Sequence, residues 1–202
     1  MKKTRLDNLY YWARYQADRA IDFNGFFWKH AEGGILIDPM PLESAELDQL
    51  DELGGAKWIL ISNADHLRAA PELKERLGAT LLAPAGDRDR FGEQADCVDS
   101  WFESSVDLPA GIDVHWIPGG KSPVEPFFYL TPLRALLFAD VVRSHVSGEL
   151  MLLPDAKLQN RAAVIAALDC LATFEPEAVL LGDGDCLFHG AQEELARFHT
   201  SL

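Results

Sequence analysis

The sequence predicts an α/β (α+β) fold with mixed β-sheets, and two observations support this class. Short apolar runs typical of buried strands recur along the chain, with helical patterns interspersed among them. These runs end repeatedly on turn residues and acidic residues. No internal repeat, low-complexity segment or linker interrupts the order, so residues 1–202 are expected to form a single domain.

Residues 8–40 favour β-structure because they are rich in the aromatic side chains that fit strands. The turn signal Glu32-Gly33-Gly34 separates two predicted strands, at residues 26–30 and 35–38. The second strand ends on Asp38, and the prolines that follow it prevent its continuation. Asp38 is therefore either a turn former or a partner for a side chain in a nearby site.

The stretch KWILISNADHLRAA, residues 57–70, joins a buried strand to reactive side chains. Its apolar residues 58–61 predict a strand, and Asp65 and His66 follow that strand almost at once. A helical pattern with Pro71 near its start comes next. A strand fixes the backbone while the loop after it leaves side chains free, so this pair suits a metal site or an acid/base site.

The rest of the chain alternates in the same way, although the acidic and turn-rich residues 84–110 give no clear pattern. The segment at residues 118–123 is too rich in glycine and proline for a regular element and predicts a tight loop. Helices are predicted at residues 42–53 with Ser44 as a candidate cap, at 71–78, at 157–174 and from about 191. Strands are predicted at residues 81–83, 112–117, 127–130, 135–139 and 178–181.

The charge and cysteine content narrow the functional classes. The net charge is −14 and the isoelectric point is near 4.7, and the 18 basic residues form no patch in the sequence. Nucleic acid and anionic membranes are therefore disfavoured as partners, and a small-molecule substrate is expected. Cys97, Cys170 and Cys186 lack CxxC spacing, and neither a signal peptide nor a membrane span is visible. We expect a cytoplasmic protein with reduced thiols, and the sequence leaves its oligomeric state open.

Acidic residues follow three of the predicted strands. Asp65 and His66 follow the strand at 58–61, Asp140 follows the strand at 135–139, and Asp183 follows the strand at 178–181. Each aspartate alone is adequately explained by a structural role, as a turn former or a helix cap. Their recurrence, with a histidine beside one of them, favours a shared metal or acid/base site.

Five segments in order resemble motifs of the metallo-β-lactamase fold superfamily. They are NGFF followed by GGILIDPMP, then ILISNADHLRAAPEL for the HxHxDH loop, IPGGKSPVEPFFYL for the PGHSPG segment, LLFAD for the strand with the bridging aspartate, and LLGDGD for the loop that usually reads PGHG. The resemblance covers most of the chain. It implies a four-layer αββα sandwich of two mixed β-sheets flanked by helices, and a metal-dependent hydrolase.

The departures from these motifs follow the division between the family's two metal sites. Ile61, Asn63 and Lys121 stand where the resemblance places three histidines of one site. The ligands implied for the other site are kept as Asp65, His66, Asp140 and Asp183, with aspartate in place of the last histidine. The resemblance therefore implies that one metal site has been dismantled and that the other still has a ligand set.

The retained set is rich in oxygen, which moves the preference from Zn²⁺ toward Mn²⁺, Fe²⁺ or Mg²⁺. We expect one divalent metal ion or none. Lys121 is expected to neutralise Asp140, and Asp65 or Lys121 to handle protons. Asn63, Arg143 and His145 are candidate substrate-binding residues, the last two in a polar loop. The alternative is that Lys121 forms salt bridges with the aspartates and no metal binds.

Three functions compete on these grounds. The first is a metal-dependent hydrolase with at most one metal that acts on a small ester, thioester, lactone or phosphoester. The second is a catalytically inactive pseudo-hydrolase that binds a small molecule or a protein partner. The third, a phosphatase of the haloacid dehalogenase type, is suggested only by Gly182-Asp183-Gly184-Asp185. It is disfavoured because the early strand ends Asp38-Pro39-Met40 and lacks the DxD motif of that class.

Overall fold

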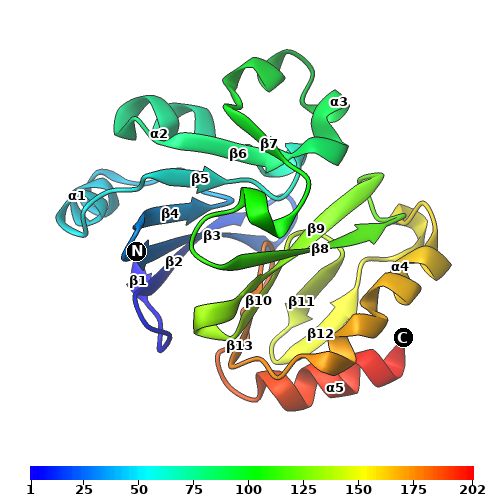
Figure 1. Cartoon of the computed structure of the whole chain (residues 1–202). Coiled ribbons are helices and arrows are strands. Elements are labelled where there is room, and N and C mark those ends of the chain that lie inside the picture. Colours follow the sequence, from blue (N-terminus) through cyan, green and yellow to red (C-terminus); the bar gives the residue numbers. More distant parts are fainter. The chain divides into compact units, whose positions relative to one another are not determined.

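Two principal β-sheets organise the chain, one in each half of the sequence (Figure 1). The computed structural model describes all residues, 1–202, which divide into unit 1, residues 1–103, and unit 2, residues 104–202. Both sheets mix parallel and antiparallel strands, and helices flank them. The predicted α/β class is therefore confirmed. The stacking of the sheets in four layers stays an expectation.

The sheet of unit 1 has seven strands in sequence order, β1-β2-β3-β4-β5-β6-β7. The first four pair antiparallel, whereas β4, β5, β6 and β7 run parallel because helical connections return the chain to the same side of the sheet. The strands are β1 (Lys2–Lys3), β2 (Leu9–Gln16), β3 (Ile21–His30), β4 (Gly33–Ile37), β5 (Trp58–Leu60), β6 (Thr80–Pro84) and β7 (Ser100–Phe102).

The helices of unit 1 confirm the two predicted between residues 42 and 78. Helix α1 is capped by Glu43 and not by Ser44, because Glu43 and Glu46 form a reciprocal capping box. Helix α2 ends at Gly78, which adopts the left-handed conformation with φ +64°. The helical elements are α1 (Ser44–Glu52), η1 (Ala64–His66), α2 (Ala70–Leu77), η2 (Ala85–Asp87), α3 (Arg88–Phe91) and η3 (Gly92–Cys97).

A row of apolar residues fixes the register of the parallel strands. Leu36, Ile59 and Leu81 are direct neighbours on β4, β5 and β6 and have no exposed surface. Burying a side chain of this size stabilises the folded state by about 1.5–3 kcal/mol. A shift of one residue would turn the whole row to the other face of the sheet. The row therefore also fixes the level at which the three strands end.

The sheet of unit 2 has four strands in the order β13-β10-β9-β8. Strands β10 and β13 run parallel, whereas β8, β9 and β10 pair antiparallel in sequence. A separate hairpin is formed by β11 and β12. The strands are β8 (Ile112–Pro118), β9 (Val124–Leu130), β10 (Ala135–Phe138), β11 (Val142–Val146), β12 (Glu149–Leu152) and β13 (Ala178–Leu181).

The long helix predicted at residues 157–174 is wrong in its length. Its regular part is only α4, because the side chain of Asn160 accepts a hydrogen bond of 3.1 Å from the Ala163 amide and caps a new start. The last residues form a 3₁₀ segment. The helical elements of unit 2 are η4 (Ser105–Asp107), η5 (Thr131–Leu133), η6 (Asp155–Lys157), α4 (Arg161–Leu168), η7 (Asp169–Thr173) and α5 (Ala191–Ser201).

Strand β11 also corrects a prediction, since Arg143 and His145 lie on this strand and not in a polar loop. Its sequence Val-Arg-Ser-His-Val carries too many polar side chains to be recognised as a strand. Arg143 and Ser144 are buried, whereas His145 is exposed. The burial of Arg143 has consequences for the site described below.

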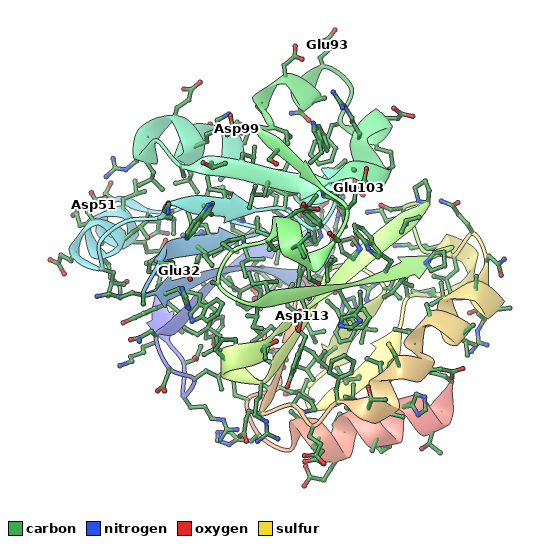
Figure 2. All side chains as sticks on the ribbon, in the orientation of Figure 1. Glu32, Asp51, Glu93, Asp99, Glu103 and Asp113 are labelled. Atoms are coloured by element: carbon green, nitrogen blue, oxygen red, sulfur yellow. The ribbon has the colours of Figure 1, made fainter.

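The surface carries much of the negative charge. Figure 2 shows the side chains of Asp51 and Glu93 extending outward from the ribbon of unit 1, and Glu32 and Asp99 are exposed as well. Such a distribution accounts for the acidity without a specific cationic ligand. None of the helices is both long enough and apolar enough to cross a lipid bilayer.

Candidate functional site

The polar residues of unit 1 gather at the carboxyl ends of the parallel strands β4, β5 and β6. Asp38 follows β4, the segment from Ser62 to His66 follows β5, and Asp87 and Arg90 follow β6. The strands are adjacent and in register, so these segments meet at one edge of the sheet. This is the position at which open α/β sheets carry functional side chains.

The carboxylate of Asp38 holds the ring of His66. It accepts hydrogen bonds from the Ser62 amide at 2.8 Å, the Ser62 hydroxyl at 2.6 Å and His66 Nδ1 at 2.8 Å. An ionised carboxylate only accepts, so the proton of a neutral imidazole is on Nδ1 and the lone pair is on Nε2. Asp38 has no exposed surface and His66 is only 3% exposed. Asp38 is thus the partner of His66.

Asp38 also adopts a backbone conformation that non-glycine residues rarely use. Its φ is +45°, and aspartate tolerates this region better than most residues. The turn is what directs the side chain toward Ser62 and His66. Both earlier interpretations of Asp38, as a turn former and as a partner of the site, therefore hold together.

Asp65 contacts a basic side chain that sequence reasoning missed. Arg90 places Nη2 at 3.2 Å from Asp65 Oδ2 and Nη1 at 3.1 Å from Asp87 Oδ2. Burial works to lower the pKa of Arg90, but Asp87 and Asp65 outweigh it and raise that pKa above the ordinary value. Asp87 is itself buried and accepts a 2.7 Å hydrogen bond from the Ala64 amide. The sequence contains a signal for these residues, because Asp87 and Arg90 follow a predicted strand just as Asp65 and His66 do.

Two positions at which the resemblance would place histidines are inside unit 1. Ile61 has no exposed surface and packs in the apolar core with Leu36 and Ile59. Asn63 is also fully buried, and its carbonyl oxygen accepts a 3.0 Å hydrogen bond from the His66 amide. Ile61 offers no donor atom, so this part of the loop lacks one ligand of the first metal site.

In unit 2 the parallel strands β10 and β13 bring Asp140 and Asp183 to the same edge of the sheet. Asp140 and Asp183 each lie two residues beyond the end of their strand, and Phe138 pairs with Leu181 in the register. The buried Glu125 on β9 fixes the first of these ends, because its Oε1 accepts from the amides of Asp140 at 2.9 Å and Val141 at 3.0 Å.

Lys121 lies beside Asp140, as predicted. Its Nζ is 3.8 Å from Asp140 Oδ2, at the limit of an ion pair. The loop that carries Lys121 is attached to the residues before α4, because the Gly119 carbonyl accepts from the amides of Gln159 and Asn160, both at 2.9 Å. A half-exposed ammonium at this distance supplies one positive charge beside the carboxylate.

Asp183 faces the buried guanidinium of Arg143, with 3.4 Å between Arg143 Nη2 and Asp183 Oδ2. Arg143 Nε also donates to His145 Nε2 at 2.9 Å. His145 Nε2 also lies 3.5 Å from Asp183 Oδ1, so the imidazole is close to both members of the pair. The charge on Asp183 is therefore compensated by Arg143.

The expected ligands are divided between the units, with Asp65 and His66 in unit 1 and Asp140 and Asp183 in unit 2. Neither unit by itself gathers three or more His, Cys, Asp or Glu side chains in a geometry that holds a metal ion. Within unit 1 the donor chemistry of His66 suits a metal ligand, because Asp38 holds the ring and leaves a lone pair on Nε2. Ile61 and Lys121 stand at two positions of the other implied site, and an apolar and a cationic side chain supply no ligand there.

Two further titratable groups of unit 2 have shifted pKa values. Burial among Phe127 and Phe174 lowers the pKa of His115, although Asp113 opposes the shift. Burial raises the pKa of the Cys186 thiol to about 12, against the hydrogen bond from the Leu181 backbone. A hollow of about 280 Å³ between η7 and α5 contains none of the predicted site residues.

Comparison with known proteins places this arrangement in a family. Solved structures with the same fold include a metallo-beta-lactamase from Pontibacter korlensis, with a TM-score of 0.75, 16% identity, and coverage of 98% of this chain and 95% of that one. TTHA1623, solved in a di-iron-bound form, has a TM-score of 0.69 and 21% identity, with coverage of 95% and 100%. FIM-1 from Pseudomonas aeruginosa, solved in a mono-zinc form, has a TM-score of 0.69 and 14% identity, with coverage of 96% and 90%.

Identities this low show the fold alone, and no curated protein sequence matches the chain significantly. A family model described as the metallo-beta-lactamase superfamily, however, matches residues 1–202. The strand ends that carry Asp65, Asp140 and Asp183 follow the order of the family's motifs. With the whole chain matched and the strand ends in that order, the protein belongs to the metallo-β-lactamase superfamily, whose members are typically metal-dependent hydrolases.

Proposed function

We propose that this protein is a hydrolase of the metallo-β-lactamase fold that holds at most one divalent metal ion. Its substrate is a small ester, thioester, lactone or phosphoester. The proposed ligands are Asp65, His66, Asp140 and Asp183, and the metal is Mn²⁺, Fe²⁺, Zn²⁺ or Mg²⁺. Relatives described in di-iron and mono-zinc forms support a divalent metal.

The contact between Asp38 and His66 is the observation that carries the proposal. A buried carboxylate at 2.8 Å from Nδ1 is the arrangement that orients metal-binding histidines and raises their basicity. Burying a carboxylate costs free energy, so a histidine that only filled space in the core would not need a buried carboxylate as its partner. Here the Ser62 amide and hydroxyl supply the remaining hydrogen bonds, so the carboxylate is stabilised without a cation.

The residues of this chain divide the chemical tasks. When bound, a single metal supplies a Lewis acid that polarises the substrate oxygen and lowers the pKa of bound water. Lys121 compensates Asp140, which removes the need for a second metal. Asp65 and Lys121 are the proposed proton-transfer groups, and Arg90 forms an ion pair with Asp65. Asn63, Arg143 and His145 are the proposed substrate contacts.

Metal analysis tests the proposal directly. Protein purified without chelator is expected to contain up to one equivalent of divalent metal by mass spectrometry, and Asp140→Ala is expected to lose it. Asp113→Ala, which changes an aspartate on β8 of the same unit, is the matched control and keeps the metal. Substoichiometric metal that Asp140→Ala leaves unchanged contradicts the single-metal site. A screen of ester, thioester, lactone and phosphoester substrates with Mn²⁺, Fe²⁺ and Zn²⁺ then identifies the reaction.

The second candidate is a catalytically inactive pseudo-hydrolase that binds a small molecule or a protein partner. The observation in its favour is that each of the three carboxylates in the ligand set faces a basic side chain of its own unit. Ion pairs of this kind stabilise a fold without any metal. Absence of turnover in the whole screen, together with metal-independent binding of a small molecule, would favour this candidate.

A further inference from the structure

The segment after β13 is attached to β11 by its backbone. Ser144 and Gly184 form an isolated parallel bridge, and the Asp185 amide donates to the Ser144 carbonyl at 2.9 Å. Gly184 has φ +80°, and a Cβ atom there would lie 1.9 Å from the Ser144 carbonyl oxygen. Only glycine permits this approach. The attachment therefore holds Asp183 opposite the side chains of β11.

Arg143 on β11 forms an ion pair with Asp183, and both side chains are more than nine-tenths buried. A buried guanidinium keeps its charge at every accessible pH because arginine does not deprotonate in proteins. Removing either partner would leave an uncompensated buried charge. The pair therefore persists unless another cation takes the place of Arg143 beside Asp183.

We propose that Arg143 is a built-in competitor of the metal ion, so that a metal binds Asp183 only in exchange for the guanidinium. This inference rests on the proposed function, because it concerns the regulation of the same site. A guanidinium and a divalent cation repel each other at contact distance, and one buried carboxylate cannot compensate both. The exchange explains how the site tolerates a metal-free state. It also predicts a weaker metal affinity than the ligand set alone would give.

The second contact of Arg143, with His145, supports an exchange of the guanidinium for a metal ion beside Asp183. Arg143 Nε donates to the ring of His145 on the same strand, which gives the guanidinium a second partner. His145 is exposed, so an Arg143 side chain that leaves Asp183 has a partner closer to solvent. When a metal ion displaces Arg143 from Asp183, the guanidinium is therefore not left buried without a partner.

Arg143→Met removes the charge and keeps the length and apolar stem of the side chain. We expect the affinity for Mn²⁺ and Zn²⁺, measured by isothermal titration, to rise at least about tenfold, since a full competing charge is removed. Without metal, the melting temperature falls because Asp183 loses its partner, and metal restores it. Wild-type protein is expected to show a smaller difference in melting temperature with and without EDTA, because its metal must first displace Arg143.

Arg134→Met is the matched control, because Arg134 belongs to the same unit but pairs at the surface with Glu175 and Glu177. It is expected to change neither metal affinity nor the response to EDTA. The combined variant Arg143→Met with Asp183→Asn is expected to lose the gain in affinity. If Arg143→Met proves insoluble, Arg143→Lys serves instead, and a smaller rise in affinity is expected because lysine keeps the positive charge but loses the guanidinium contacts.

An unchanged metal affinity in Arg143→Met, with a lower melting temperature that metal does not restore, overturns the inference and makes Arg143 structural. Its failure is distinguishable from that of the proposed function. Wild-type protein that holds no metal and hydrolyses nothing refutes the proposed function, yet a metal-binding Arg143→Met protein still establishes the competition. Conversely, a metal-loaded wild-type hydrolase with an indifferent Arg143→Met variant refutes only the competition.

Discussion

Asp38 in unit 1 and Asp183 in unit 2 are both buried aspartates at the carboxyl ends of parallel strands, but their carboxylates have different partners. Asp38 accepts from an amide, a hydroxyl and an imidazole, whereas Asp183 faces a guanidinium. With neutral donors, the main effect of the Asp38 carboxylate is to orient the His66 ring. With a permanent cation, the main effect of the Asp183 carboxylate is to balance charge. A buried aspartate thus orients a neighbour or compensates one, depending on its partner and not on its own position.

Asp38→Ala is expected to cause the largest loss of stability among the variants that test these two roles, orientation of a neighbour and compensation of its charge. This change leaves His66 Nδ1, the Ser62 amide and the Ser62 hydroxyl without their acceptor in the core. Breaking a buried polar network of this kind costs about 3–5 kcal/mol in the free energy of unfolding, which urea denaturation measures. Asp38→Asn keeps the shape and the left-handed backbone and should cost clearly less. Equal losses for the two variants would show that the charge, and not the geometry, is what His66 requires.

An intermediate effect is expected where backbone contact holds Asp183 in place. Gly184 and Gly148 have nearly equal φ values, +80° and +82°, but only Gly184 has atoms within 4 Å of a new Cβ. Gly148→Ala should cost about 1–2 kcal/mol from backbone strain alone. Gly184→Ala should cost a further 1–3 kcal/mol or so, because the Ser144 carbonyl must move.

Alkylation of Cys186 gives this comparison a second measurement. The high pKa of its thiol keeps it unreactive at pH 8 in wild-type protein. Release of the segment by Gly184→Ala is expected to make Cys186 reactive, as mass spectrometry can show, whereas Gly148→Ala leaves it protected. Equal stability and equal labelling of the two variants would mean that the segment does not depend on its contact with β11.

The smallest effect distinguishes an imidazole held by aromatic rings from one held by a carboxylate. Burial lowers the pKa of His115 below the ordinary 6.5, so the unfolded chain binds this proton more readily. Its contribution to stability is present above pH 6.5 and is lost as the pH falls toward the lowered pKa. His115→Phe should therefore flatten the fall in unfolding free energy below pH 6.5. A wild-type slope that His115→Phe leaves unchanged would assign the acid sensitivity to other groups.

Much of the fold was predictable because apolar strands end abruptly on polar residues. The strands that precede Asp38, Asp65, Asp140 and Asp183 were all read correctly to within a residue or two. Strand β11 was not, because its buried members include Arg143 and Ser144, which look like loop residues until their partners are known. The helix predicted at 157–174 failed for a local reason, since Asn160 caps a later start.

The identity of the site residues was easier to predict than their pairing. The family's motifs point to Asp65, Asp140 and Asp183, and the contact between Lys121 and Asp140 follows from their positions in those motifs. The guanidinium partners do not follow, because Arg90 and Arg143 come from segments that carry no motif. The long side chain of arginine can reach a partner that is distant in the sequence, so sequence spacing does not predict which carboxylate it pairs with.

The attachment of the Lys121 loop to the start of α4 has a consequence for motion. The Gln159 side chain donates to the Lys121 carbonyl at 3.1 Å, and the amides of Gln159 and Asn160 donate to Gly119. A loop and a helix end that share these bonds open together as one cooperative unit. Slow hydrogen exchange at the Gln159 and Asn160 amides therefore reports on the closed loop, almost forty positions away from Lys121 along the chain. A ligand that fixes the Lys121 loop would be visible as added protection at the first turn of α4.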